Sequence, residues 1–434
     1  MAMYLRQDKM DMNIVEEIEI VDTGNDVDLM QQVLRDDENF IRNVSQFFNQ
    51  KDLSDVTITV GEQSYFGHKF VLAKSSDVFR TMLYGDGWTQ GQDQELILTE
   101  SDECQAVFDV FLRFMYTAEV TVTVDTAVGI LCLADKYNVT SLKSLCVGYM
   151  IQNTQSPRVH NALHWYNWAK ALHLEDLVES CTKTIAWNIE AILGSTEWHN
   201  MDLQFIRDIL NNSGLVVANE HLLYTGLVSW LQYESHEENL RENAEALLPL
   251  IRFPQMLVSQ LYNIELSDFF ELPEVNCILK ELVNKAYRYR SLCPTQVKLD
   301  VTFDGPFYKP RNYMDLAVDS VLMQNTLRFG IQVDVRTYAG PVVSENRNGE
   351  WKITYRKHEN NWTINLFCHE SATINGEAFI EVCVLIFNDE EKVIQVDMVP
   401  ATVCTRTNNL GLNVNVDNPA ASKNMVLLIK PVPH

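Results

Sequence analysis

The chain has 434 residues, of which 46% are hydrophobic, and its 59 acidic against 34 basic side chains give a net charge of −25. This acidity excludes a general affinity for nucleic acid, which needs clustered lysine and arginine, and it disfavours binding to anionic membranes. The length exceeds one ordinary hydrophobic core and predicts two to four domains.

The first fifty residues divide into an acidic tail and a helix. Residues 1–28 are acidic without hydrophobic periodicity, which predicts a disordered, solvated tail. Over residues 29–50 apolar side chains recur at helical spacing and include the adjacent pair Phe47 and Phe48. This helix either packs on the core that follows it or offers its apolar face to a second copy of the chain.

Between residues 53 and 150, short strands and amphipathic helices alternate closely. Val56, Ile58 and Val60 alternate with threonines, which is typical of a strand with one buried face. Apolar residues from 70 to 83 follow helical spacing, and residues 96–98 form another short apolar run. This mixture predicts one small α+β domain.

The same segment resembles the BTB/POZ domain. Five motifs follow the family's order and spacing: LSDVT around Asp55, His68-Lys69, residues 75–79, FMYT at 114–117 and ADKY at 134–137. The resemblance implies a non-catalytic interaction module that is usually a homodimer. It also implies that the preceding helix is the family's dimerisation helix, with contacts from Phe40, Ile41, Val44, Phe47 and Phe48.

The polar, glycine-rich stretch from residue 84 to residue 94 predicts a loop with Trp88 in its middle. In BTB proteins that bind the scaffold protein cullin-3, this loop carries a hydrophobic residue, any residue, then glutamate. Here the match is Trp88-Thr89-Gln90, with an amide in place of the acid. Tyr116 matches a second cullin-contacting position, and its alternative role is packing in the core.

Residues 151–292 show repeated helical periodicity and predict an all-helical domain. The runs LVSWL (227–231) and IRFPQM (251–256) resemble, in this order, the BACK domain that commonly follows BTB. The resemblance implies an elongated arm of paired helices, the first of which extend the cullin-3 contact.

Residues 296–434 change to a period of two, and roughly eight short strands predict an antiparallel β-sandwich. After a BTB and BACK pair, such a sandwich resembles the TRAF-like domain, which takes extended peptides. Trp351, Tyr355 and Trp362 are the peptide-binding candidates, and each alternatively belongs to the core. The predicted fold class is therefore multidomain α+β: a BTB/POZ domain (29–150), a BACK domain (151–292) and a TRAF-like sandwich (296–434).

No constellation for catalysis is apparent. Phosphate-loop, zinc-protease and nucleophile-elbow motifs are absent, and His160 and His164 lack a third metal ligand. The nine cysteines form no CxxC pair, which predicts neither zinc nor a redox pair, only buried thiols in a reducing compartment. We expect no catalytic residue, no metal and no cofactor.

The predicted function is a non-catalytic adaptor that dimerises through its BTB domain. It would bind cullin-3 as the substrate-recognition subunit of a ubiquitin ligase and capture an unidentified protein with its sandwich. The alternative is a dimeric scaffold or transcription-linked adaptor without cullin-3, which Gln90 favours. The first residues lack the apolar core of a signal peptide, so we expect a cytoplasmic protein, with the nucleus as the alternative, and no nucleic-acid or membrane partner.

Overall fold

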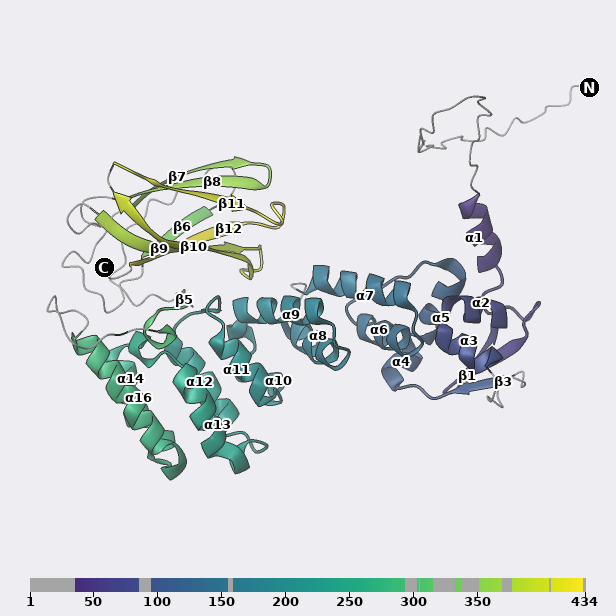
Figure 1. Cartoon of the computed structure of the whole chain (residues 1–434), viewed down its shortest axis with the longest axis horizontal. Coiled ribbons are helices and arrows are strands. Elements are labelled where there is room, and N and C mark those ends of the chain that lie inside the picture. Colours follow the sequence, from purple (N-terminus) through teal and green to yellow (C-terminus); the bar gives the residue numbers. More distant parts are fainter. Residues whose placement is uncertain are drawn as a thin grey trace, which may run out of the picture.

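The computed structural model describes residues 36–85, 95–154, 159–292, 303, 305–314, 332–337, 351–368, 377–405 and 407–431. A small mixed unit lies at one end of a long helical arm, and a β-sandwich lies against the other half of that arm (Figure 1). Among the described helices, none is long and apolar enough to cross a membrane.

The mixed unit is built on a three-stranded sheet of order β2-β1-β3. Strand β1 (Val56–Val60) pairs antiparallel with β2 (Gln63–Gly67) and parallel with β3 (Glu95–Leu98). Side chains of β1 alternate between buried and half-buried positions, as the valine–threonine alternation predicts.

In the described part of this unit, helices α1 to α7 surround the sheet or lead away from it. Their bounds are α1 (Asp37–Ser45), α2 (Lys69–Ser75), α3 (Asp77–Tyr84), α4 (Asp102–Ala106), α5 (Phe108–Thr117), α6 (Ala127–Lys136) and α7 (Thr140–Asn153). Ser76 separates α2 from α3, because its backbone is extended and its side chain accepts a hydrogen bond from the Phe79 amide as the N-cap of α3.

The helical arm continues the core of the mixed unit without a break. Its helices are α8 (Val159–Ala171), α9 (Glu175–Trp187), α10 (Thr196–His199), α11 (Leu203–Asn211), α12 (Glu220–Leu231), α13 (Leu240–Leu247), α14 (Val258–Glu265), α15 (Asp268–Glu271) and α16 (Pro273–Leu292). The prediction of an all-helical region needs one correction. Strand β4 (Val216–Val217), two buried β-branched residues, pairs in parallel with β5 (Asn312–Tyr313).

The sandwich has two sheets, of order β10-β9-β12-β6 and β11-β8-β7. Its strands are β6 (Gln332–Thr337), β7 (Trp351–His358), β8 (Asn361–Cys368), β9 (Glu377–Phe387), β10 (Val393–Thr405), β11 (Leu410–Asn415) and β12 (Asn424–Pro431). The expectation of a purely antiparallel sandwich is wrong at one place, since β12 pairs in parallel with β6. The strand expected near Val297 and the turn expected at Asn375-Gly376 lie outside the described residues.

Strand β12 is apolar on both of its faces because each face is buried in a different core. Met425, Leu427 and Ile429 face the interior of the sandwich. Val426 and Leu428 instead join a second cluster that includes Trp187 at the end of α9. A continuous apolar run is therefore the sequence signal of a strand that lies between the sandwich core and the helical arm.

Polar contacts reinforce this contact between sandwich and arm. The side-chain amide of Asn188, just after α9, donates to the Val393 carbonyl oxygen and accepts from the Val393 amide, both at 3.1 Å. The buried ammonium of Lys430 on β12 donates to the Asn312 side chain at 2.7 Å. These bonds join chain segments that lie far apart in the sequence, and they fix the sandwich to the arm.

Candidate protein-interaction surfaces

Helix α3 presents one exposed face at the surface of the mixed unit while its other face is buried. Phe79 is fully buried and stacks on Tyr137, with ring centroids 4.5 Å apart. The Ser76 hydroxyl donates to the Tyr137 carbonyl oxygen at 2.5 Å, which ties the start of α3 to the end of α6. These contacts attach the inner side of α3 to the core and leave its outer side chains at the surface, where Asp77 pairs with Arg80 at 3.3 Å.

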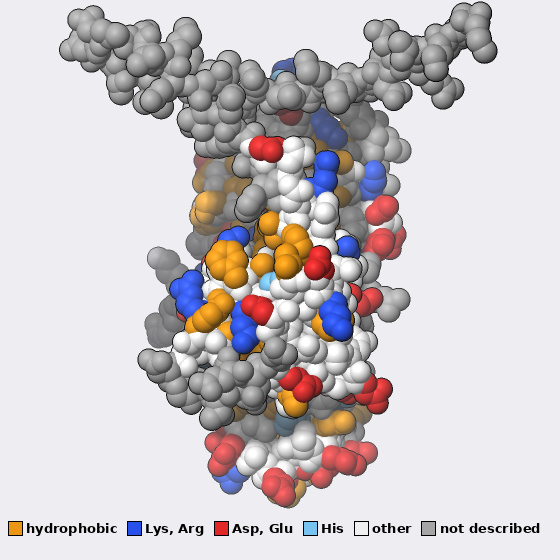
Figure 2. All heavy atoms as spheres, turned by 90° about the vertical axis from the view of Figure 1, so that its right-hand side faces the viewer, with side chains coloured by type: hydrophobic (Ala, Val, Ile, Leu, Met, Phe, Trp, Pro, Cys, Tyr) orange, Lys and Arg blue, Asp and Glu red, His pale blue; other side chains and the backbone are white. Residues whose placement is uncertain are grey.

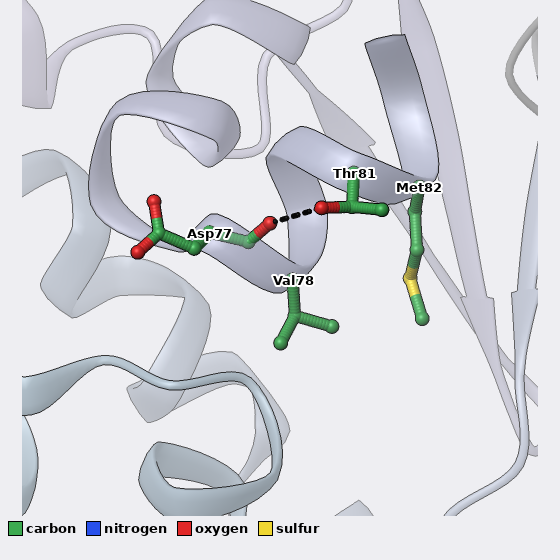
Figure 3. Close-up of a pocket in the computed structure, with 4 residues that line it drawn as sticks. All are labelled: Asp77, Val78, Thr81 and Met82. Carbon is green, nitrogen blue, oxygen red and sulfur yellow. Dashed lines mark hydrogen bonds between the residues drawn. The ribbon is translucent and has the colours of Figure 1, made fainter. Parts of the chain in front are cut away.

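The exposed face of α3 borders an open hollow of about 290 Å³ lined by Asp77, Val78, Thr81 and Met82. Figure 3 shows Val78 and Met82 pointing to the same side of the helix, and the Thr81 hydroxyl donating to the Asp77 carbonyl oxygen at 2.9 Å. The hollow combines two apolar side chains with one carboxylate, and no buried polar group converges on it. Such a surface suits a protein side chain better than a small polar ligand.

The predicted cullin-3 motif follows α3 directly in the sequence. Trp88, Thr89 and Gln90 lie outside the described residues, so their contact role stays a prediction. The described part of α3 ends with Tyr84, whose side chain is exposed.

Tyr116 on α5 lies in the core and is 3% exposed. Its hydroxyl accepts a hydrogen bond from the His68 amide at 3.0 Å, and the His68 imidazole lies at the same distance. Burial raises the pKa of Tyr116 to about 12. This position favours the packing alternative, since little of the ring is open to a partner.

The turn that follows α1, after Ser45, is anchored to the core of its own chain through aromatic contacts. Phe47 meets the His68 ring edge-on at 5.7 Å, Phe48 meets Tyr116 at 5.8 Å, and the Arg113 guanidinium lies over the Phe48 ring. Val44 is also packed against this core. Part of the predicted dimer face therefore packs within its own chain, and Ile41 stays exposed. The side chain of Phe40 lies outside the described residues.

Further apolar side chains stand exposed on the segments that follow α1. Leu53 and Phe70 are each 74% exposed, and Phe66 is also exposed. Hydrogen bonds hold their segments together, from the Phe66 amide to Asn49 and from the Lys69 amide to Asp55. Figure 2 views this end of the molecule and shows hydrophobic groups among mixed charges. We name Ile41, Leu53, Phe66 and Phe70 the N-terminal apolar face, a surface that suits association with another protein.

The peptide-binding candidates of the sandwich all lie in its core. Trp351 and Tyr355 on β7 and Trp362 on β8 are buried between the two sheets. The Trp362 indole donates to the Glu359 carbonyl oxygen at 3.1 Å. Their burial favours the core alternative, because a peptide on the sheet surface would not reach these rings.

Comparison with known families explains the first two parts of this architecture. The BTB/POZ domain model matches residues 44–154, and the model described as BTB And C-terminal Kelch, the BACK domain, matches residues 162–265. The chain carries a BTB/POZ domain followed by a BACK domain.

Relatives of this BTB–BACK chain are longer proteins that match it over part of their length. BTB/POZ domain-containing protein 17 of Mus musculus is 28% identical over 323 residues, which is 73% of this chain and 65% of the relative. The Homo sapiens protein of the same name is 27% identical over the same shares. Galectin-3-binding protein of Mus musculus is 26% identical over 66% of this chain and 49% of its own length. The chain thus spans less than two thirds of the curated relatives it matches.

The matched BTB and BACK ranges both end before the sandwich. In the described part of the sandwich, the large hydrophobic side chains that stand exposed are Met398 and Val403, both on β10. Strand β10 is at the edge of its sheet and carries a register shift around Pro400. The sequence pattern did not identify Met398 and Val403 as surface residues. An apolar residue in a strand gives the same hydrophobic signal whether its side chain is buried or exposed.

Among the described residues, no group of three or more His, Cys, Asp or Glu side chains has the arrangement of a metal site. His164 lies on α8, and the side chain of His160 is not described. The BTB–BACK architecture is that of protein-interaction adaptors. The hollow at α3 and the N-terminal apolar face are surfaces suited to contacts with other proteins.

Proposed function

We propose that this BTB–BACK protein is a dimeric substrate adaptor of a cullin-3 ubiquitin ligase. The observation that carries the proposal is the order of the domains, a BTB domain continued by a helical BACK arm with a further globular domain at its far end. The chain would work in the cytoplasm by proximity and without chemistry of its own, since it would raise the effective concentration of a substrate near the ligase.

Dimerisation would use the N-terminal apolar face. Its four exposed hydrophobic side chains lie on α1 and on the segments after it, and Phe47 and Phe48 fix the turn that follows α1 to the core. A rigid helix that exposes an apolar edge loses little conformational entropy when a second copy covers it.

Cullin-3 would bind along α3 and the segment that follows it. Val78 and Met82 offer an apolar hollow beside the carboxylate of Asp77, and Trp88 supplies a large aromatic anchor a few residues later in the sequence. Gln90 can hydrogen-bond in place of the family's glutamate but carries no charge.

The sandwich would take the substrate, as a TRAF-like domain does. Its attachment to the arm through Asn188, Lys430 and the Trp187 cluster supports a fixed position relative to the BTB domain. The exposed Met398 and Val403 on β10 supply an apolar surface on the sandwich itself. An unidentified protein segment that covers this edge strand is the proposed substrate contact.

The test is a pull-down of the full-length chain with the N-terminal region of cullin-3, beside a light-scattering mass. We expect a dimer that retains cullin-3, and we expect Trp88→Ala and Val78→Asp to weaken the binding at least about tenfold. Tyr262→Ala, an exposed aromatic on α14 of the arm, is the matched control and should bind as the natural chain does. A dimer that ignores cullin-3 at micromolar concentration rejects the ligase role.

The second candidate is a dimeric scaffold without cullin-3, and the amide at Gln90 favours it. Gln90→Glu separates the two functions. If the natural chain fails to bind cullin-3 and the Gln90→Glu variant binds it, the result supports the hypothesis of a scaffold that works without cullin-3. If the natural chain and the Gln90→Glu variant bind cullin-3 with similar affinity, the interface tolerates the amide and the result supports the adaptor hypothesis.

A further inference from the structure

The BTB domain brings two cysteines together that the sequence keeps far apart. Cys104 lies on α4 and Cys132 on α6, and their thiols hydrogen-bond to each other. The Cys104 sulfur also lies 3.8 Å from the Gly129 carbonyl oxygen. The absence of a CxxC motif hid this pair, because the two cysteines meet only when α4 packs on α6.

The close crossing of α4 and α6 is built around Gly129. A Cβ atom at this position would lie 2.6 Å from the Glu103 carbonyl oxygen and 2.9 Å from the Val107 side chain. Only glycine at this position therefore lets α4 and α6 pack this closely. Cys132 lies one turn further along α6. The close approach at Gly129 brings the Cys104 side chain against α6, where it meets the Cys132 thiol.

The two thiols differ in the direction of their pKa shifts and in exposure. The hydrogen bond with Cys132 lowers the pKa of Cys104 to about 6, and the Ser101 hydroxyl and the Lys136 ammonium act in the same direction. The same hydrogen bond, together with burial, raises the pKa of Cys132. Cys104 is buried and Cys132 is half-buried, so the pair reaches solvent on the Cys132 side.

We propose that Cys104 and Cys132 form an oxidation site that closes to a reversible disulfide on reaction with a hydroperoxide. A thiolate that lies beside a second thiol is the arrangement that reacts with a small oxidant and is then resolved within the same domain. This site is independent of the proposed ligase function.

The reaction balances in two steps. The Cys104 thiolate attacks one oxygen of hydrogen peroxide, the O–O bond breaks, and the sulfenic acid forms with release of hydroxide, which becomes water. The Cys132 sulfur then attacks the Cys104 sulfur, the S–O bond breaks, and the departing hydroxide takes the Cys132 proton as a second water. Two thiols lose two electrons, and the peroxide gains them.

A second thiol pair in the same chain gives an internal comparison. Cys368 on β8 and Cys404 on β10 also hydrogen-bond to each other across the two sheets of the sandwich. Both are buried, and burial raises the pKa of Cys368 to about 12. We therefore expect this pair to stay reduced under conditions that oxidise the pair in the BTB domain.

The test exposes the folded full-length chain to hydrogen peroxide, blocks free thiols with N-ethylmaleimide and maps peptides by mass spectrometry without reductant. We expect a peptide link between Cys104 and Cys132 that forms about tenfold faster than Cys277, an exposed single thiol, is oxidised. Dithiothreitol should reverse the link. Cys132→Ser should prevent it and leave a sulfenic acid on Cys104 that dimedone traps.

The control is Cys146→Ser, which removes a buried cysteine of α7 and should leave the link unchanged. Circular dichroism of each variant confirms that it is folded. The proposal is overturned if natural protein keeps Cys104 and Cys132 reduced while Cys277 is oxidised, or if Cys104 links to a different cysteine.

Discussion

Arg311 and Glu220 form an ion pair in which both side chains are 0% exposed, with 3.2 Å between the Arg311 Nε and a Glu220 carboxylate oxygen. Arg311 precedes β5, on the segment that leads toward the sandwich, and Glu220 begins α12 of the BACK arm. The Arg311 guanidinium also donates to the carbonyl oxygens of Asn212 and Leu250. The segment after the arm is thus anchored inside it.

The first prediction is that Arg311→Met destabilises the arm by about 3–5 kcal/mol, because it leaves the Glu220 carboxylate buried without its main counter-charge. The Arg252 amide and the Tyr313 hydroxyl would still donate to that carboxylate and limit the loss. Urea unfolding followed by tryptophan fluorescence measures the change. The double variant Glu220→Gln with Arg311→Met should recover part of it.

The control for this prediction is Arg241→Met, which removes one partner of an exposed ion pair with Glu245 on α13. Because exposed ion pairs contribute about 0–1 kcal/mol, the unfolding midpoint should move little. Equal losses from Arg311→Met and Arg241→Met would show that the buried pair has no special role in stability.

The second prediction concerns the attachment of the sandwich. Asn188→Ala removes both hydrogen bonds to the backbone of Val393 and leaves these groups to find water. We expect the Val393 amide to exchange its hydrogen at least about tenfold faster, with a stability loss of about 1–3 kcal/mol. Asn211→Ala, an exposed position at the end of α11, is the matched control. Unchanged exchange at Val393 would mean that the apolar cluster alone holds the sandwich.

Periodicity predicted the strands and helices well wherever one face of an element is buried. Val56, Ile58 and Val60 identify β1 because their alternation matches the strand period. The same rule could not predict that β12 pairs in parallel with β6, or that β4 joins β5, because both pairings depend on partners far along the chain. Hydrophobic patterns identify elements and leave long-range pairing open.

The interaction residues were harder to predict, for a physical reason. Aromatic side chains such as Tyr116 and Trp362 stabilise both protein cores and protein interfaces. The residue type alone therefore does not distinguish the two roles. Lys430, Arg311 and Glu220 are ordinarily surface residues, so composition gave no sign of their burial. Their roles depend on their neighbours in the folded structure, and these neighbours cannot be read from the order of residues in the sequence.

The third prediction separates the two roles of Tyr116. Tyr116→Phe keeps the ring and removes the hydroxyl that accepts from the His68 amide, which leaves that donor inside the domain without its partner. We expect a loss of about 1–3 kcal/mol in the unfolding free energy of the BTB domain, with the affinity for cullin-3 unchanged in the folded protein. Unchanged stability with weakened cullin-3 binding would instead assign Tyr116 to the contact.

The fourth prediction uses the buried ammonium of Lys430. Burial lowers the pKa of Lys430 below its ordinary value, so the unfolded chain binds this proton more tightly than the folded chain does. Between the lowered folded pKa and the ordinary pKa of about 10.4, the unfolded state therefore carries more protons and stability rises with pH. Below the folded pKa this contribution is constant, and it favours the unfolded state.

Lys430→Met tests this sign, because methionine keeps the side-chain length and removes the charge. The unfolding free energy of the natural chain relative to Lys430→Met should rise as the pH increases toward 10, and other titrating groups cancel in the difference. Lys423→Met, a lysine at the surface just before β12, should show no such trend. A difference between the natural chain and Lys430→Met that is independent of pH would mean that the folded protein keeps the Lys430 ammonium as readily as water does.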